Sequence, residues 1–170
     1  MRRAILLRHA TAGEARGDAL RDLTPEGRSQ AASAGRRIAA LDAAWAPTRA
    51  LCSSALRASA TLEAARGALA GLARVEFCDA LYLAGAGGLL SALQRVPDTE
   101  LCVLLVAHEP GLSEFVRQLA SRAAPDARAN LARGMAPASF AALALDIARW
   151  EDAAAGCAEL VVFGSSADVP

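Results

Sequence analysis

The 170-residue chain contains no lysine, so its 18 basic residues are all arginine, and 18 acidic residues balance them. A chain without net charge lacks the basic surplus typical of nucleic-acid-binding proteins and of polybasic membrane anchors. Aromatic residues are scarce at 4%, and alanine supplies much of the 54% hydrophobic content. Alanine favours closely packed helices over a bulky core. The length predicts a single domain over residues 1–170.

Paired cysteines are also missing. None of the four cysteines (Cys52, Cys78, Cys102 and Cys157) belongs to a C-x-x-C motif, and no histidine lies near them at a metal-ligand spacing. We therefore expect no zinc site and no cofactor. Three of the four fall in apolar runs typical of buried strands, which predicts reduced thiols in the core. Reduced thiols place the chain most simply in the cytoplasm.

Long apolar runs are absent. Residues 1–8 imitate the start of a signal peptide, but the apolar stretch 4–7 is much shorter than an h-region of ~7–15 residues. No run approaches the ~18 apolar residues of a membrane span. We expect no membrane partner and no nucleic-acid partner.

Short apolar runs alternate with segments of helical periodicity. Strands are predicted at residues 4–7, 50–53, 75–78, 101–107, 140–147 and 160–163, and helices at about 25–41, 55–72, 89–96 and 111–122. Residues 85–88 and 125–137 are predicted as loops. The alternation predicts an α/β three-layer sandwich, with a mostly parallel, mixed central sheet and helices on both faces. The short connection before the strand 101–107 leaves no room for a large cap domain.

Both histidines directly follow predicted strands. His9 comes after the strand 4–7, next to Arg8, and His108 comes after the strand 101–107. The carboxyl ends of parallel strands meet at the end of a sheet where ligands bind. A single histidine is more often an ordinary surface or core residue. Two histidines that meet at this end of the sheet, with no others in the chain, predict a functional pair.

Arg57 lies in the first turn of the predicted helix that follows the strand 50–53. A cation there opposes the helix dipole, which favours anions at this end. One interpretation is a solvated arginine on the helix surface. The other is that the guanidinium and the helix N-terminus bind an anion together. The nearby Arg8, His9 and His108 favour the second interpretation.

Three segments resemble the motifs of the histidine phosphatase superfamily, the phosphoglycerate-mutase-like group. Residues 7–10 (Leu-Arg-His-Ala) are similar to its Arg-His-Gly/Ala signature, residues 53–61 to its second motif and residues 106–111 to its third. Order and spacing match over nearly the whole chain. The short length and the missing cap resemble the small SixA-type phosphohistidine phosphatase branch, as does the segment 21–27. Ala10 stands where the larger superfamily usually has glycine, although the small branch commonly has alanine.

The resemblance implies a phosphohistidine intermediate and no metal. His9 is the expected nucleophile, with its other ring nitrogen donating to a backbone carbonyl. Arg8 and Arg57 are expected to clamp the phosphoryl oxygens, since planar guanidinium groups suit phosphate. His108 is expected to add another donor to those oxygens. Arg21 is either a further clamp or a surface residue.

The leaving group needs a proton from a general acid, unless it is a good leaving group such as imidazole. Asp18 is the first candidate for the general acid, because it lies in the loop after the first strand and the small branch has an acidic residue at the matching place. Glu14, Asp22 and Glu109 are the alternatives. Exposed loop carboxylates are usually only solvated, so the assignment stays open.

Three functions compete. The first is a phosphatase acting on a phosphorylated protein, such as a histidine phosphotransfer domain, because a site without a cap is open to a protein side chain. The second is a general phosphomonoesterase for small metabolites that uses the same site. The third is a non-catalytic phosphate-binding module, which the presence of the nucleophile and the clamps disfavours. A mutase is not expected, because nothing in the sequence would enclose an intermediate.

Overall fold

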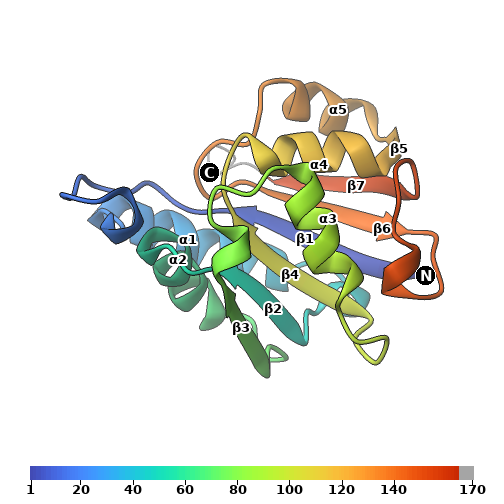
Figure 1. Ribbon diagram of the computed structural model, residues 1–170, viewed down its shortest axis with the longest axis horizontal. Coiled ribbons are helices and arrows are strands. Elements are labelled where there is room, and N and C mark those ends of the chain that lie inside the picture. The colour runs from blue at the N-terminus through green and yellow to red at the C-terminus, as the bar shows by residue number, and fades with distance from the viewer. Residues whose placement is uncertain (165–170) are drawn as a thin grey trace.

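The computed structural model describes residues 1–164, so the end of the predicted domain, 165–170, lies outside the described residues. In the described part, seven strands form one sheet in the order β3-β2-β4-β1-β6-β7-β5 (Figure 1). The strands are β1 (Arg2–Arg8), β2 (Arg49–Ser53), β3 (Arg74–Cys78), β4 (Cys102–Ala107), β5 (Ala120–Ala123), β6 (Phe140–Leu145) and β7 (Ala158–Gly164). The helices are α1 (Pro25–Ala39), α2 (Leu56–Arg66), α3 (Ala86–Gln94), α4 (Gly111–Leu119) and α5 (Pro125–Ala132).

The sheet is mixed and mostly parallel, as predicted. β1 pairs in parallel with β4, β4 with β2 and β2 with β3, so these four strands point the same way. β6 runs antiparallel to both β1 and β7, and β5 is parallel to β7. We call the end of the sheet where β1, β2, β3 and β4 finish the carboxyl end, and the opposite end the amino end.

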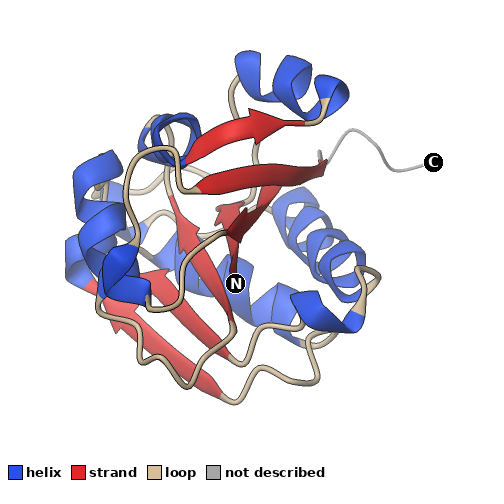
Figure 2. Ribbon diagram, turned by 90° about the vertical axis from the view of Figure 1, so that its right-hand side faces the viewer, coloured by secondary structure: helices blue, strands red, loops and turns tan. Residues whose placement is uncertain are grey.

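Helices cover both faces of the sheet (Figure 2). Along β1 the side chains of Ile5 and Leu7 face a core shared with α1 and α2, whereas Leu6 faces the core shared with α3 and α4. β4 is buried at every position, as expected for a central strand. A Cβ atom at Gly35 of α1 would lie 2.3 Å from the backbone oxygen of Ala65 in α2, so these alanine-rich helices meet at their backbones.

Several predicted boundaries are wrong. α2 ends at Arg66 rather than near residue 72, and α3 begins at Ala86, inside the predicted loop 85–88. α4 ends at Leu119 rather than near residue 122, and the chain continues directly into β5, which was not predicted. The predicted loop 125–137 contains α5, which begins with Pro125 at its first position. A proline is favoured there, because the first turn of a helix needs no hydrogen bond from that nitrogen.

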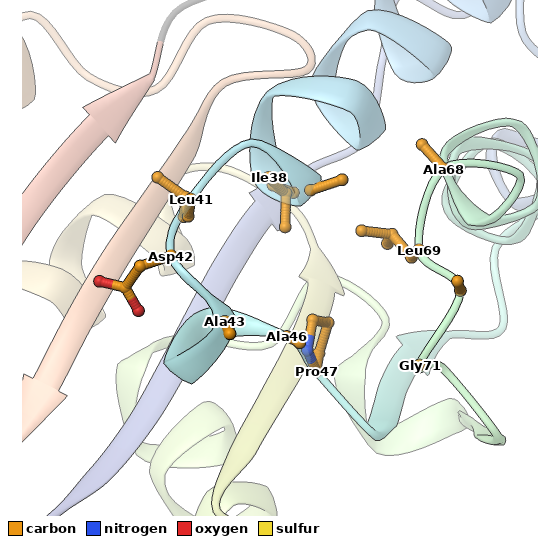
Figure 3. A pocket seen from close by; sticks show the side chains of 11 residues that line it. Ile38, Leu41, Asp42, Ala43, Ala46, Pro47, Ala68, Leu69 and Gly71 are labelled. Carbon is orange, nitrogen blue, oxygen red and sulfur yellow. The ribbon is translucent and has the colours of Figure 1, made fainter.

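The connection between β3 and β4 consists of a 3₁₀ turn (Asp79–Leu81), α3 and short loops, so this connection contains no cap domain. A mainly apolar hollow of about 200 Å³ lies between the C-terminal ends of α1 and α2, towards the amino end of the sheet (Figure 3). Cys52 and Cys102 are buried in β2 and β4, where burial raises the pKa of both thiols to about 12. Of the described helices, none combines the length and the apolar character needed to cross a membrane.

Candidate active site

The carboxyl end of the sheet brings together the residues of all three motifs. Arg8 is the last residue of β1, His9 follows it, and His108 follows β4. The ring centroids of the two histidines lie 5.2 Å apart. Nε of Arg57, from the first turn of α2, donates to Nε2 of His9 at 3.3 Å. His9, Arg57 and His108 are far apart in the sequence but meet at one place, because the parallel strands that precede them end side by side.

The ring of His9 is held in one tautomer. Its Nδ1 lies 2.8 Å from the carbonyl oxygen of Ala10, and because a carbonyl only accepts, Nδ1 carries the proton. Nε2 therefore keeps its lone pair and accepts from Arg57. Burial is the largest cause that lowers the pKa of His9 to about 4; the positive charges of Arg57, Arg8 and Arg21 contribute to this shift, and the hydrogen bond to the Ala10 carbonyl opposes it. The imidazole is thus neutral at pH 7, with a free lone pair on Nε2.

His108 is oriented by Ser53, the last residue of β2. Nε2 of His108 lies 2.8 Å from Oγ of Ser53, which also accepts from the backbone N–H of Ala55 at 3.3 Å. In the described residues the hydroxyl proton has no other acceptor, so it is donated to Nε2, and the proton of the neutral ring is on Nδ1. Burial, followed by the proximity of His9, lowers the pKa of His108 to about 4. His108 is therefore a neutral N–H donor.

The two predicted clamps differ in how their donors are used. Arg57 is buried, and its terminal nitrogens donate to the backbone oxygen of Asp18 at 2.7 Å and to Oδ2 of the same residue at 2.9 Å. Arg8 donates through Nη1 to the carbonyl of Met135 at 2.6 Å. Arg21 donates to the carbonyl of Gly13 and to Oδ1 of Asp18 at 3.3 Å, so it reaches the cluster through Asp18.

Of the four carboxylates considered as general acid, Asp18 is the one that contacts the cluster. It accepts from the hydroxyl of Tyr82 at 2.7 Å as well as from Arg57 and Arg21. The hydrogen bond from Tyr82 is the largest cause that lowers the pKa of Asp18 to about 2, so this carboxylate is ionised at neutral pH.

The alternative acids contact other groups. Asp22 pairs with Arg28 at 2.7 Å, and Glu14 is exposed. Glu109 accepts from the backbone nitrogens of Ser113 and Met135, which ties the start of α4 to the loop after α5.

Tyr82 is a site residue that sequence reasoning missed. It follows the 3₁₀ turn Asp79–Leu81, outside the three motifs, and its ring meets the ring of His108 edge-on at a centroid distance of 5.8 Å. The guanidinium carbon of Arg57 lies 5.9 Å from the centre of the Tyr82 ring. A Cβ atom at Gly111 would lie 1.9 Å from the backbone oxygen of Ala84, so the loop that carries Tyr82 touches the His108 motif backbone to backbone.

Thr61 ties two motifs together. Its Oγ1 accepts from the backbone N–H of Ala10 at 2.9 Å and donates to the backbone oxygen of Arg57 at 2.6 Å. The side chain is fully buried. The threonine of the second motif therefore fixes the start of α2 against the residue that follows His9.

Buried donors without partners lie at this end of the sheet. Within residues 1–164, the buried side-chain polar atoms that lack a hydrogen bond are Arg8 Nε, His108 Nδ1 and Ser139 Oγ. Ser139 precedes β6, which begins beside the end of β1. Buried polar groups are almost always paired, so unpaired donors beside the neutral ring of His9 suit an anionic ligand. The described residues contain no group of three or more His, Cys, Asp or Glu side chains arranged for a metal ion.

Comparisons with known proteins agree with this geometry. No family model matches the sequence. An uncharacterised protein from Mycobacterium tuberculosis is 34% identical over 165 residues, covering 92% of this chain and 98% of that protein. A candidate phosphohistidine phosphatase SixA from Nakamurella multipartitia is 31% identical in structure-based alignment, with a TM-score of 0.83, covering 95% of this chain and 94% of that one.

Two further structures share the fold. A candidate phosphohistidine phosphatase SixA from Agrobacterium tumefaciens has 26% identity and a TM-score of 0.75, covering 95% of this chain and 96% of that one. The protein histidine phosphatase SixA complexed with tungstate has 22% identity and a TM-score of 0.77, covering 99% of each chain, which shows the fold alone. With its three motifs assembled at the carboxyl end of the same sheet, the chain belongs to the histidine phosphatase superfamily, in the small SixA-type branch.

Proposed function

We propose that the chain is a metal-independent phosphatase that hydrolyses phosphohistidine, or a related phosphomonoester, through a covalent phosphohistidine on His9. One observation carries the proposal: the hydrogen bond from Nδ1 to the Ala10 carbonyl leaves the lone pair of His9 on Nε2, beside the guanidinium of Arg57. The relatives named as candidate phosphohistidine phosphatases support the same reaction class.

In the first step Nε2 of His9 attacks the phosphorus in line with the leaving group. The new N–P bond forms as the bond to the leaving group breaks, and the leaving group takes that electron pair. Negative charge on the three equatorial oxygens is neutralised by Arg8 and Arg57 and by the N–H of His108. Arginine and imidazole donors thus supply the charge neutralisation that metal ions supply in other phosphoryl-transfer enzymes.

In the second step water attacks the phosphorus of the phosphohistidine. The N–P bond breaks, its electron pair returns to Nε2, and inorganic phosphate leaves. The hydrogen bond between Nδ1 and Ala10 keeps the ring in place throughout, since it does not involve the reacting nitrogen. The low pKa of His9 favours a neutral ring as the product, ready for another turnover.

The state of Asp18 favours phosphohistidine over esters with poor leaving groups. A general acid must hold a proton, whereas the pKa of Asp18 is lowered to about 2. Its carboxylate also accepts from Nη2 of Arg57, and its backbone oxygen accepts from Nη1, so a substrate has to compete with Asp18 for these donors. An imidazole leaving group depends less on an acid than an alkoxide does. The role of Asp18 as general acid stays a prediction.

The test is to incubate the purified protein with a histidine phosphotransfer domain phosphorylated on histidine and to follow phosphate release. His9→Ala is the control, and we expect it to abolish both turnover and trapping of a phosphoenzyme. Sugar phosphates and nucleotides serve as competitors. An active His9→Ala variant would refute the covalent mechanism. A clear preference for the metabolites would favour the small-molecule phosphatase, and binding without turnover would favour a non-catalytic module.

A further inference from the structure

The loop between α5 and β6 is bound to the end of β1. The carbonyl of Met135 in this loop accepts from Nη1 of Arg8 at 2.6 Å. The backbone N–H of Ala138 donates to the carbonyl of His9 at 3.3 Å. The carbonyl of Ser139, the last residue before β6, accepts from the backbone N–H of Arg8 at 3.0 Å. The loop therefore touches both residues of the first motif that we assign to the reaction.

The side chains of Arg8 and Ser139 lie on the same face of the sheet. β1 and β6 are antiparallel with Leu7 opposite Phe140, so the next pair in this register is the one that the backbone hydrogen bond joins. Ala138 and Phe140 face the core shared with α1 and α2, and side chains alternate along a strand, so Ser139 faces the α3 and α4 side. Arg8 faces that side too, because Leu7 faces the other. The Cβ atoms of such a pair lie about 5 Å apart.

Each member of this pair has a buried polar atom without a partner. Within residues 1–164, neither Nε of Arg8 nor Oγ of Ser139 makes a hydrogen bond, and Ser139 is fully buried. Burial lowers the pKa of Arg8, and the charge of Glu109 opposes this shift. A buried N–H needs an acceptor, and a hydroxyl offers two lone pairs. The two unpaired atoms therefore complement each other.

The backbone before Ser139 is strained. Ala138 has a φ of 58°, in the left-handed region that residues other than glycine rarely adopt. Such conformations persist where the surrounding contacts fix them, and they cluster at functional sites. One of these contacts is the hydrogen bond from Ala138 to the carbonyl of His9. The strained residue thus ties the position of the Ser139 hydroxyl to the segment that carries His9.

We propose that Ser139 is a positioning residue for Arg8: when a phosphoryl group draws the guanidinium away from the carbonyl of Met135, the hydroxyl of Ser139 accepts from Nε. This inference rests on the proposed function and adds a residue outside the three motifs to its site. An arginine side chain is long and flexible, so a hydrogen bond at Nε fixes the plane of its guanidinium. The terminal nitrogens are then left for the phosphoryl oxygens.

A serine with a purely structural role has its partners before a ligand binds. Ser113 is such a residue: it is buried, its hydroxyl donates to the carbonyl of Pro110 at 3.1 Å, and it accepts from Arg117 at 3.3 Å. Loss of the Ser113 hydroxyl should therefore lower the stability of the ligand-free protein. Loss of the Ser139 hydroxyl should instead weaken the binding of phosphate.

The test is a double-mutant cycle that combines Ser139→Ala with Arg8→Lys. Lysine keeps the positive charge but has a methylene in place of Nε, so it cannot use the Ser139 hydroxyl in the proposed way. Calorimetry measures the dissociation constant for inorganic phosphate, and steady-state kinetics measure kcat/KM for free phosphohistidine. Ser113→Ala is the matched control, and urea unfolding reports the stability of each variant.

In the parent background we expect Ser139→Ala to weaken phosphate binding and to lower kcat/KM by about tenfold, as loss of a charge-assisted hydrogen bond does. In the Arg8→Lys background the same substitution should change both quantities by less than about twofold. Ser113→Ala should keep phosphate binding within about twofold of the parent while it lowers the free energy of unfolding.

Equal losses in the two backgrounds would overturn the role of Ser139, because its effect would then not pass through Nε of Arg8. Unchanged phosphate binding in Ser139→Ala would overturn it as well. A parent protein that binds phosphate without hydrolysing phosphohistidine would end the proposed function, and the phosphate constants would still decide the role of Ser139. A parent protein that neither binds phosphate nor hydrolyses phosphohistidine would overturn both.

Discussion

The two ends of the sheet carry arginine clusters that differ in how their donors are paired. At the amino end the buried carboxylate of Glu100 accepts from Thr48 at 2.5 Å, from Arg74 at 2.8 Å and from Arg49 at 3.5 Å. Arg2 donates there to three backbone carbonyls and to Asp98. Every buried charge at this end has an opposite charge or a carbonyl beside it.

The carboxyl end is arranged differently. Arg8 and His108 each keep a buried donor without a partner in the described residues, and the carboxylate that Arg57 contacts belongs to the exposed Asp18. A cluster with paired donors stabilises the fold. A cluster with unpaired buried donors costs stability and persists where a ligand supplies the missing acceptors. The pairing of the donors, more than the presence of arginine, distinguishes the site.

The strongest test of this contrast is to replace one arginine at each end of the sheet by alanine. Arg57→Ala should lower kcat/KM for phosphohistidine by about 10²–10³, as loss of an oxyanion donor does. Arg74→Ala should leave kcat/KM unchanged and lower the free energy of unfolding by about 1–2 kcal/mol, because Glu100 loses a charge-assisted hydrogen bond. Steady-state kinetics and urea unfolding measure the two effects. A large loss of activity in Arg74→Ala would break the contrast.

Acid should weaken the carboxyl end before the amino end. The pKa of both histidines is about 4 in the folded chain, against 6.5 for the free side chain. Between these values the unfolded chain binds more protons, so stability is complete above pH 6.5 and is lost as the pH falls towards 4. The pKa of Glu100 is lowered, mainly by Thr48, so its contribution is lost at lower pH.

Urea unfolding at about pH 7, 5.5 and 4.5 measures this loss, which we expect to reach roughly 2–4 kcal/mol. A variant with His9→Asn and His108→Asn together is the control and should show a much flatter dependence. Equal slopes in the two proteins would mean that the histidines are not held neutral by the fold.

Without the hydroxyl of Ser53, the ring of His108 should no longer be held in one tautomer. Because Ser53 donates to Nε2, Ser53→Ala allows the proton to move to that nitrogen and takes the donor away from the phosphoryl group. We expect kcat to fall by about tenfold with little change in KM. Ser59→Ala in α2, the helix that follows Ser53, is the control, since the hydroxyl of Ser59 contacts only the Leu56 backbone among the described residues.

Nitrogen-15 NMR of the imidazoles reports the tautomers directly. The chain has two histidines, so two ring patterns are expected, both with the proton on Nδ1 in the parent protein. Ser53→Ala should change the pattern of His108 alone. A parent spectrum with the proton of His108 on Nε2 would contradict the role assigned to Ser53.

The smallest effect is expected for Asp18→Asn. With a pKa of about 2 the carboxylate is ionised throughout the working range, so its loss should change kcat/KM for an aryl phosphate by less than about tenfold and leave the shape of the pH–rate profile intact. Loss of the alkaline limb in the variant would establish Asp18 as the general acid instead.

The sequence shows which side chains lie together where short motifs directly follow strands. Arg8, His9 and His108 could be placed together because the end of a buried strand fixes the position of the next residue. Tyr82 could not, since its position depends on the contact between Ala84 and Gly111, which no local pattern reveals. The hydrogen-bond partners of the arginine donors could not be predicted either, because the carbonyl that accepts from Arg8 belongs to Met135, in a distant loop.

The errors in the fold have similar causes. β5 is four residues long and has two exposed polar side chains, so no alternation of apolar residues predicts it. It forms because one edge of β7 is free to pair with it. α5 buries only Ala127 and Leu131, which leaves a weak helical periodicity. Its start could have been recognised from Pro125 followed by Asp126, a typical beginning of a helix.

The backbone contact between Gly111 and Ala84 has a consequence for how such an enzyme diverges. It makes the segment 82–84 and the His108 motif one rigid unit, so neither can shift without the other. New substrate preferences would then arise by exchanging side chains on a fixed frame, with Leu83 outside and Tyr82 inside. Side-chain exchanges at positions 82 and 83 would then change the surroundings of His9 while its ring and the neighbouring Arg57 stay where they are.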